Sequence, residues 1–158
     1  MVTLLRTDST HPDFIKLVQW LDADLKARDG EDHSFYAQFN KIDTIRNAVV
    51  AYADTVPVAC GAFKFFADGQ AEVKRMYVLP EFRRQGIAAT VLSHLEEWAK
   101  EEGYTGLVLE TGQAQPEALA LYQRSGYRII PNYGQYAGVE NSVCFQKDLT
   151  TLAPAEDR

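Results

Sequence analysis

Cysteine and histidine are scarce in this sequence, with two cysteines and three histidines among 158 residues. Cys60 and Cys144 stand in apolar surroundings without a Cys-x-x-Cys spacing, which excludes a disulfide framework and favours buried free thiols in a reducing cytoplasm. His11, His33 and His94 are scattered without the spacing of metal ligands. The sequence therefore supports no metal site.

Long apolar runs and an excess of basic residues are also missing. No stretch is long enough to span a membrane, and the first residues lack the apolar core of a signal peptide, so we expect no membrane association and a cytoplasmic protein. The formal net charge of −6 argues against nucleic acid as a partner, because binding it needs a concentrated basic surface. The hydrophobic content of 46% suits one domain, which we expect over residues 1–150, followed by a frayed polar tail at 151–158.

Two common phosphate-binding loops are absent as well. A P-loop needs Gly-Lys-Ser/Thr, but Ile87 and Ala88 follow Gly86, and a dinucleotide fingerprint needs three spaced glycines where this stretch has one. What the stretch does contain is a β-rich segment at 72–79, a stop at Pro80 and the start of an amphipathic helix. A helix start offers unpaired N–H groups and the positive end of a dipole, which suit a diphosphate, and Arg83 and Arg84 add cationic donors beside it.

Two motifs together indicate a family. The pattern Arg-x-x-Gly-x-Ala at 83–88 resembles the acyl-CoA pyrophosphate loop of the GNAT superfamily of N-acetyltransferases, although by itself it also fits an ordinary strand-to-helix connection with two solvated arginines. Residues 115–127, QPEALALYQRSGY, resemble the family's Asn-x-x-Ala-x-x-Leu-Tyr-x-x-x-Gly-Phe/Tyr helix. The matching positions are Ala118, Leu121, Tyr122, Gly126 and Tyr127.

The expected elements follow the same architecture. Apolar spacing and turn residues predict a first strand at 2–6, a helix opening at His11 and closing at 29–30, and a short helix at 34–39. An antiparallel meander of strands at 47–53, 58–66 and 72–79 comes next, then a helix at 87–102, a strand at 107–111, the Tyr122 helix, and strands at 127–130 and 142–149. This order predicts an α/β domain with a mixed, mostly antiparallel central sheet flanked by helices, which is similar to the GNAT fold from residue 4 to 149.

The resemblance implies acetyl-CoA as cosubstrate and assigns residues to it. Its pyrophosphate would lie on the loop and helix start formed by Arg83, Arg84, Gln85, Gly86, Ile87, Ala88 and Ala89. Pantetheine would enter where the 72–79 strand parts from the 107–111 strand, and would bond like an extra strand to the backbone of Met76, Tyr77 and Val78. Gln115 stands where the family usually has Asn, and Arg84 where Gly is common; Arg84 should be harmless if its side chain faces solvent.

The resemblance also implies a direct transfer of the acetyl group to an amine. Tyr122 matches the family's general acid, which protonates the departing thiolate, although an aromatic residue on a short helix also fits a core position. Glu72 occupies the place of a catalytic base in some members, and Glu110 is a second candidate. Each carboxylate also fits a structural ion pair, and some members have no dedicated base. A main-chain N–H near 76–78 would stabilise the oxyanion.

The acceptor is expected to be a small-molecule amine, with a peptide or protein amine as the second class. Acidic and aromatic side chains that could hold an ammonium group are Asp29, Glu31, Asp32, Phe35, Tyr36, Tyr133 and Tyr136, although such residues are more often solvated or packed. A homodimer is expected because family members often form one. The alternative function is a noncatalytic acyl-CoA-binding sensor on the same scaffold.

Overall fold

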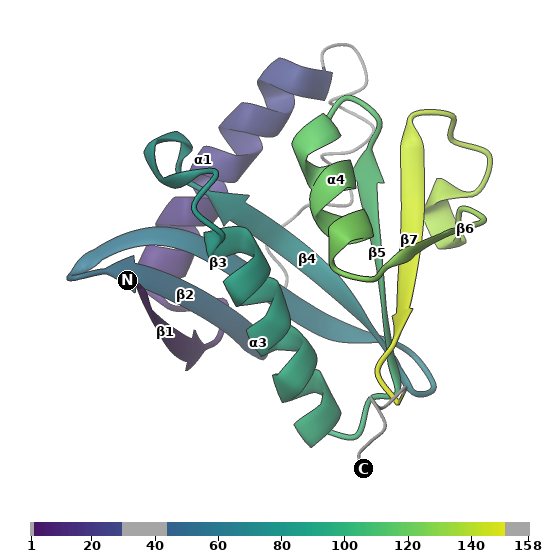
Figure 1. Ribbon diagram of the computed structural model, residues 1–158, viewed down its shortest axis with the longest axis horizontal. Coiled ribbons are helices and arrows are strands. Elements are labelled where there is room, and N and C mark those ends of the chain that lie inside the picture. Colours follow the sequence, from purple (N-terminus) through teal and green to yellow (C-terminus); the bar gives the residue numbers. More distant parts are fainter. Residues whose placement is uncertain (1, 30–43, 151–158) are drawn as a thin grey trace.

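The computed structural model describes residues 2–29 and 44–150 and places their strands in one mixed sheet flanked by helices (Figure 1). In chain order the elements are β1 (Val2–Thr7), α1 (Pro12–Asp29), β2 (Asn47–Ala53), β3 (Val56–Ala67), β4 (Gln70–Val78), the 3₁₀ turn η2 (Pro80–Phe82), α3 (Ile87–Glu101), β5 (Gly106–Gly112), α4 (Pro116–Arg124), β6 (Arg128–Ile130), η3 (Gly134–Tyr136) and β7 (Ser142–Asp148).

The sheet has the order β1-β2-β3-β4-β5-β7-β6. Every neighbouring pair is antiparallel except β4 and β5, which are parallel and pair only from Gln70 to Glu72 against Gly106 to Val108. Beyond this short contact the two strands diverge, as Figure 1 shows. The expected parting of these strands is therefore present, and it opens the middle of the sheet.

Alternate residues of β2 pack on opposite faces of the sheet, which defines two core layers. Val49 and Ala51 belong to the cluster built on α3, whereas Ala48 and Val50 belong to the cluster built on α1. The apolar face of α3 is buried because its residues recur at helical spacing: Ile87, Val91, Leu92, Leu95 and Ala99. The two helices thus hold the N-terminal half of the sheet between them.

Most element predictions are confirmed, with boundaries that shift by one or two residues. The meander of β2, β3 and β4 is present, and β4 begins at Gln70 and ends at Val78 where the sequence predicted 72–79. The turn-rich segment after β6 contains the short η3 turn, which the sequence did not predict. The predicted helix at 34–39 and the tail at 151–158 lie outside the described residues. Among the residues that are described, no helix combines the length and apolar character needed to cross a bilayer.

Candidate active site

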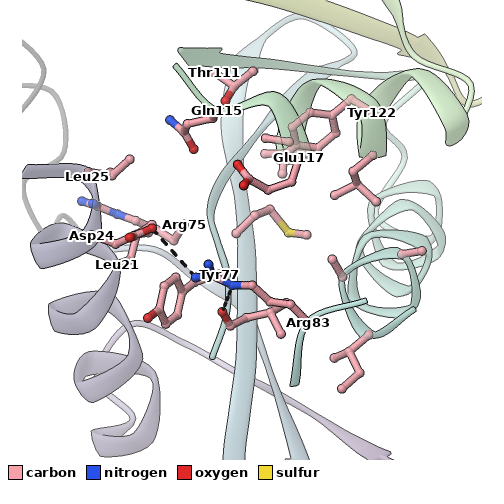
Figure 2. Close-up of a pocket in the computed structure, with 18 of the residues that line it drawn as sticks. Leu21, Asp24, Leu25, Arg75, Tyr77, Arg83, Thr111, Gln115, Glu117 and Tyr122 are labelled. Carbon is pink, nitrogen blue, oxygen red and sulfur yellow. Dashed lines mark hydrogen bonds and ion pairs between the residues drawn. The ribbon is translucent and has the colours of Figure 1, made fainter. Parts of the chain in front are cut away.

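The divergence of β4 and β5 creates a cavity of about 830 Å³, shown in Figure 2. It is lined by parts of α1, β4, the loop into α3, the end of β5, α4 and η3. The predicted site residues that line it are Glu72, Met76, Tyr77, Val78, Arg83, Arg84, Gly86, Ile87, Ala88, Ala89, Gln115 and Tyr122. Gln85 is exposed and is not among the lining residues. Two motifs far apart in the sequence therefore meet at one cavity.

A β-bulge in β4 shapes the centre of this cavity. The β3–β4 register shifts between Cys60 and Ala62, so that Arg75 and Met76 together face Gly61. Arg75 adopts a left-handed φ of 62°, a conformation that costs a non-glycine residue about 1 kcal/mol. The Met76 side chain lies over Gly61, because a Cβ placed on Gly61 would be 2.5 Å from Met76 Sδ. Gly61 is therefore required by the close approach of the bulge.

The main chain of β4 leaves an open edge beside the cavity. Leu79 N–H donates to Val58 O on β3 at 2.9 Å, and Tyr77 pairs with Cys60, so both residues face β3. Because successive residues of a strand face alternate edges, the main chain of Val78 faces the cavity instead. Of the residues predicted to bond to pantetheine like an extra strand, Val78 is therefore better placed than Tyr77.

The loop before α3 has the geometry of an anion cradle. Arg84 and Gly86 adopt left-handed φ angles of 65° and 80°, and no side chain caps the helix that starts at Ile87. A Cβ placed on Gly86 would meet no atom within 4 Å, so the space above the helix start is open. The N–H groups of the first helical turn have no intrahelical partner, so they are available to an anion. Arg84 is exposed, which is the condition under which an arginine can replace the usual glycine here without harm.

The Arg83 side chain lines the cavity while it contacts both β4 and α1. Its Nε donates to Val78 O at 2.8 Å, its Nη2 lies 3.9 Å from Asp24 Oδ2 on α1, and its guanidinium is 5.6 Å from the centre of the Tyr77 ring (Figure 2). These contacts hold Arg83 between β4 and α1. Arg84 is then the exposed cation of the loop, and sequence reasoning missed Asp24 because nothing in the sequence pattern pairs it with Arg83.

The carboxylate candidates lie on the opposite face of the sheet from α3. Glu72 is 6% exposed, accepts a hydrogen bond of 2.7 Å from the Tyr133 hydroxyl, and has Oε1 3.9 Å from Lys74 Nζ. Glu110 follows Leu109, which packs against the α3 side, so its side chain is on the face of Glu72 and lines the same cavity. Burial lowers the pKa of Lys74, and the nearby Glu72 charge partly opposes this shift.

Tyr122 occupies the wall of the cavity that α4 forms. Its ring is 6% exposed and packs at a tilt on Phe145, with ring centres 5.7 Å apart. Burial is the main cause that raises the pKa of its phenol, and the Glu110 charge adds to this. Tyr122 therefore both packs in the core and lines the cavity.

Several lining residues were not identified from the sequence. Leu21 of α1, Arg75 of the bulge, and Thr111 and Glu117 near α4 all contribute to the wall. Tyr133, a candidate for acceptor binding, instead holds Glu72, while Tyr136 of η3 lines the cavity. The helical spacing of Leu21 and Leu25 could have identified the α1 face, whereas Arg75 gave no signal. Within residues 2–29 and 44–150, no group of three His, Cys, Asp or Glu side chains is placed to hold a metal ion.

Comparison with known proteins identifies relatives over most of the chain. The acetyltransferase (GNAT) family model matches residues 14–127. An IAA acetyltransferase from Azospirillum brasilense is 32% identical over 94% of this chain and 98% of its own length. Three further curated relatives match over 85%, 57% and 57% of this chain and over 62%, 61% and 64% of their own lengths.

Solved structures show the same fold. A Klebsiella pneumoniae protein, proposed to be an acyl-CoA N-acyltransferase, superposes with a TM-score of 0.79 at 31% identity, covering 94% of this chain and 98% of that one. The PaiA N-acetyltransferase of Thermoplasma acidophilum, crystallised with coenzyme A, has a TM-score of 0.70 at 17% identity, covering 94% of this chain and 99% of that one.

The strand order, the parting of β4 from β5 and the loop before α3 define the acyl-CoA N-acyltransferase fold. The chain belongs to the GNAT family of acetyltransferases, and its class is that of the acetyl-CoA-dependent acyltransferases.

Proposed function

We propose that this protein transfers the acetyl group of acetyl-CoA to a primary amine of a small molecule. The observation that carries the proposal is the meeting, in one cavity, of an uncapped helix start, an open strand edge and a buried phenol. A peptide or protein amine is the second class of acceptor.

The chain's own residues fit the cosubstrate. The left-handed turn at Arg84 and Gly86 and the first turn of α3 would hold the pyrophosphate through main-chain N–H groups. Val78, whose carbonyl oxygen accepts from Arg83 Nε, would bind pantetheine through its N–H where β4 has no partner strand, and Gln115, which precedes the first turn of α4, lines the same passage. The PaiA neighbour was crystallised with coenzyme A, which supports coenzyme A as a ligand of this fold.

Acetyl-CoA supplies an activated thioester, and three groups of the protein act around it. The Glu72 carboxylate, held by Tyr133, accepts the proton that the attacking amine loses. A main-chain N–H near 76–78 stabilises negative charge on the carbonyl oxygen. Tyr122 donates a proton to the departing sulfur, which its raised pKa permits because the phenol stays protonated at neutral pH.

The test is a free-thiol release assay with acetyl-CoA over a panel of amines, combined with calorimetry of acetyl-CoA binding. Acetylated product with at least one small amine supports the proposal. Binding without product from any amine would favour the noncatalytic acyl-CoA sensor, and absence of binding would overturn both functions.

We also propose that the protein is cytoplasmic and forms a homodimer. A reducing cytoplasm suits two buried cysteines that form no disulfide. A homodimer is proposed because bulky apolar side chains, among them Phe65 at 63% exposure and Ile129 at 59%, remain on the surface. Light scattering would measure the assembly, and a monomer mass would contradict a dimer.

A further inference from the structure

Two adjacent cationic side chains stand on the face of β4 that carries Glu72. Lys74 pairs with Ala62, which packs against α1, so Lys74 is on the α1 side of the sheet. Arg75 reaches the same side, since its Nη1 lies 3.7 Å from Asp22 Oδ1 of α1. In a regular strand these neighbours would face opposite ways, and the bulge is what brings both to one wall of the cavity.

Charges of both signs line the cavity. Glu72 is held by Tyr133 and has Oε1 3.9 Å from Lys74 Nζ, and the Glu110 charge acts on the Tyr122 phenol. Arg75, whose Nη1 lies 3.7 Å from Asp22 Oδ1, is shown in Figure 2 beside Leu25 and Asp24, across the cavity from Tyr122. A molecule that reached from Tyr122 towards α1 would therefore approach the Arg75 guanidinium at its far end.

The backbone at Arg75 is an outlier at this point of the cavity. A φ of 62° is disfavoured for arginine, and glycine or asparagine would relieve it. Arg75 is nevertheless 7% exposed and lines the cavity. Strained residues of this kind cluster at binding sites, where the strained backbone aims a side chain.

We propose that the acceptor is an amine that also carries a carboxylate, which Arg75 binds with help from Lys74. Its amino group then points to Glu72, Glu110 and the thioester. A guanidinium binds a carboxylate through two parallel N–H donors, and this fixes the orientation of the acceptor as well as its affinity. The inference rests on the proposed acetyltransferase function and narrows its acceptor class.

The experiment compares acceptors that differ only in this carboxylate. Suitable pairs are β-alanine with β-alaninamide, γ-aminobutyrate with γ-aminobutyramide, and L-leucine with L-leucinamide. The value of kcat/KM is taken per neutral amine, since an amide lowers the pKa of a nearby amino group. We expect at least one acid to exceed its amide by about 10-fold to 100-fold, the ratio that hydrogen bonds to a charged group provide.

Variants assign this preference to the proposed residues. Arg75→Gln should reduce the acid-to-amide ratio towards one while acetyl-CoA affinity changes little, and Arg75→Lys should retain part of the ratio. If the Arg75→Gln protein fails to fold, Lys74→Gln provides the second measurement. Asp22→Asn is the control for the ion pair on α1, and Arg84→Gln, in the pyrophosphate loop, should raise the KM for acetyl-CoA and leave the ratio unchanged.

The outcomes separate the two proposals. Equal rates for acids and amides would overturn the carboxylate inference and leave the acetyltransferase function standing. A ratio that survives Arg75→Gln and Lys74→Gln would overturn the assignment to these residues. Failure of every amine, acid or amide, to give product with bound acetyl-CoA would overturn the function itself.

Discussion

Buried Tyr122 and partly buried Tyr133 show how position decides the chemistry of one residue type. The Tyr133 hydroxyl donates a hydrogen bond of 2.7 Å to Glu72 Oε2, so this hydroxyl is engaged in holding a carboxylate. Burial, followed by the Glu72 charge, raises the pKa of Tyr133 above its ordinary value. Tyr122 lines the same cavity beside Glu110, and its pKa is also raised. We therefore propose Tyr122 as the general acid and Tyr133 as the positioning residue.

Tyr122→Phe tests the acid role. Loss of the hydroxyl should lower kcat by about 100-fold, the lower end of what general acid catalysis contributes, and leave the Kd of acetyl-CoA within about 2-fold. Because the pKa of Tyr122 is raised, the protonated acid persists above the ordinary phenol value of 10.0, so the wild-type rate should show no alkaline loss below about pH 10. Thiol release and calorimetry measure both quantities; an unchanged kcat would remove Tyr122 from catalysis.

A pair of isosteric variants distinguishes the two carboxylates. Glu72→Gln keeps an oxygen acceptor for Tyr133 but removes the base, so we expect kcat to fall by about 100-fold at neutral pH. Glu110→Gln is the matched change on β5 and should leave kcat largely unchanged. The reverse pattern would assign the base to Glu110, and two unchanged kcat values would mean that no dedicated base is used.

At the scale of elements, the bulge in β4 depends on a residue in β3. A Cβ on Gly61 would approach Met76 Sδ to 2.5 Å and Leu95 Cδ1 to 3.0 Å, so Gly61→Ala should push Met76 into the cavity. We expect a loss of about 1 to 3 kcal/mol in the free energy of unfolding and a higher KM for acetyl-CoA. Adding Met76→Ala should recover part of that stability. Losses that simply add in the double variant, measured by urea unfolding, would contradict the contact.

The loop into α3 contains a second strained residue, and two substitutions separate strain from charge. Arg84→Gly and Arg84→Ala both remove the cation, but only glycine relaxes the φ of 65°. Arg84→Gly should therefore be more stable than Arg84→Ala by about 1 kcal/mol. Both should weaken acetyl-CoA binding to a similar extent and reduce its salt dependence. Equal stability of the two variants in thermal unfolding would show that the backbone is not strained there.

For the whole molecule, local patterns predicted the elements but not the contacts between distant ones. The apolar spacing of α3 and the small residues after Pro80 were readable, because they depend on neighbours in sequence. The bulge at Arg75 could not be predicted, because a left-handed φ is usually found at glycine and here it occurs at an arginine. The same limit applies to Arg83, whose partner Asp24 lies far away in the sequence on α1. The sequence thus predicted which motifs form the cavity, whereas the partners of its charged side chains are known only from the tertiary structure.

The whole fold should lose stability at alkaline pH, because it buries several phenols and a thiol. Burial is the main cause that raises the pKa of Tyr122, Tyr127, Tyr133 and Tyr136, and it also raises the pKa of the Cys60 thiol. In the unfolded chain these groups ionise near their ordinary values of 10.0 and 9.0, whereas the native protein keeps their protons. The unfolded state then binds fewer protons, so stability is fully present below about pH 9 and declines as pH rises towards the native pKa values.

Urea midpoints should therefore stay level up to about pH 9 and fall steadily above about pH 10. Tyrosinate absorbance of these buried residues should appear together with the loss of circular dichroism, because the native state does not expose them. The control is the same titration in concentrated urea, where every tyrosine should ionise near its ordinary value. Complete tyrosinate formation with the secondary structure intact would contradict the burial of these side chains, and with it the protonated state assigned to Tyr122.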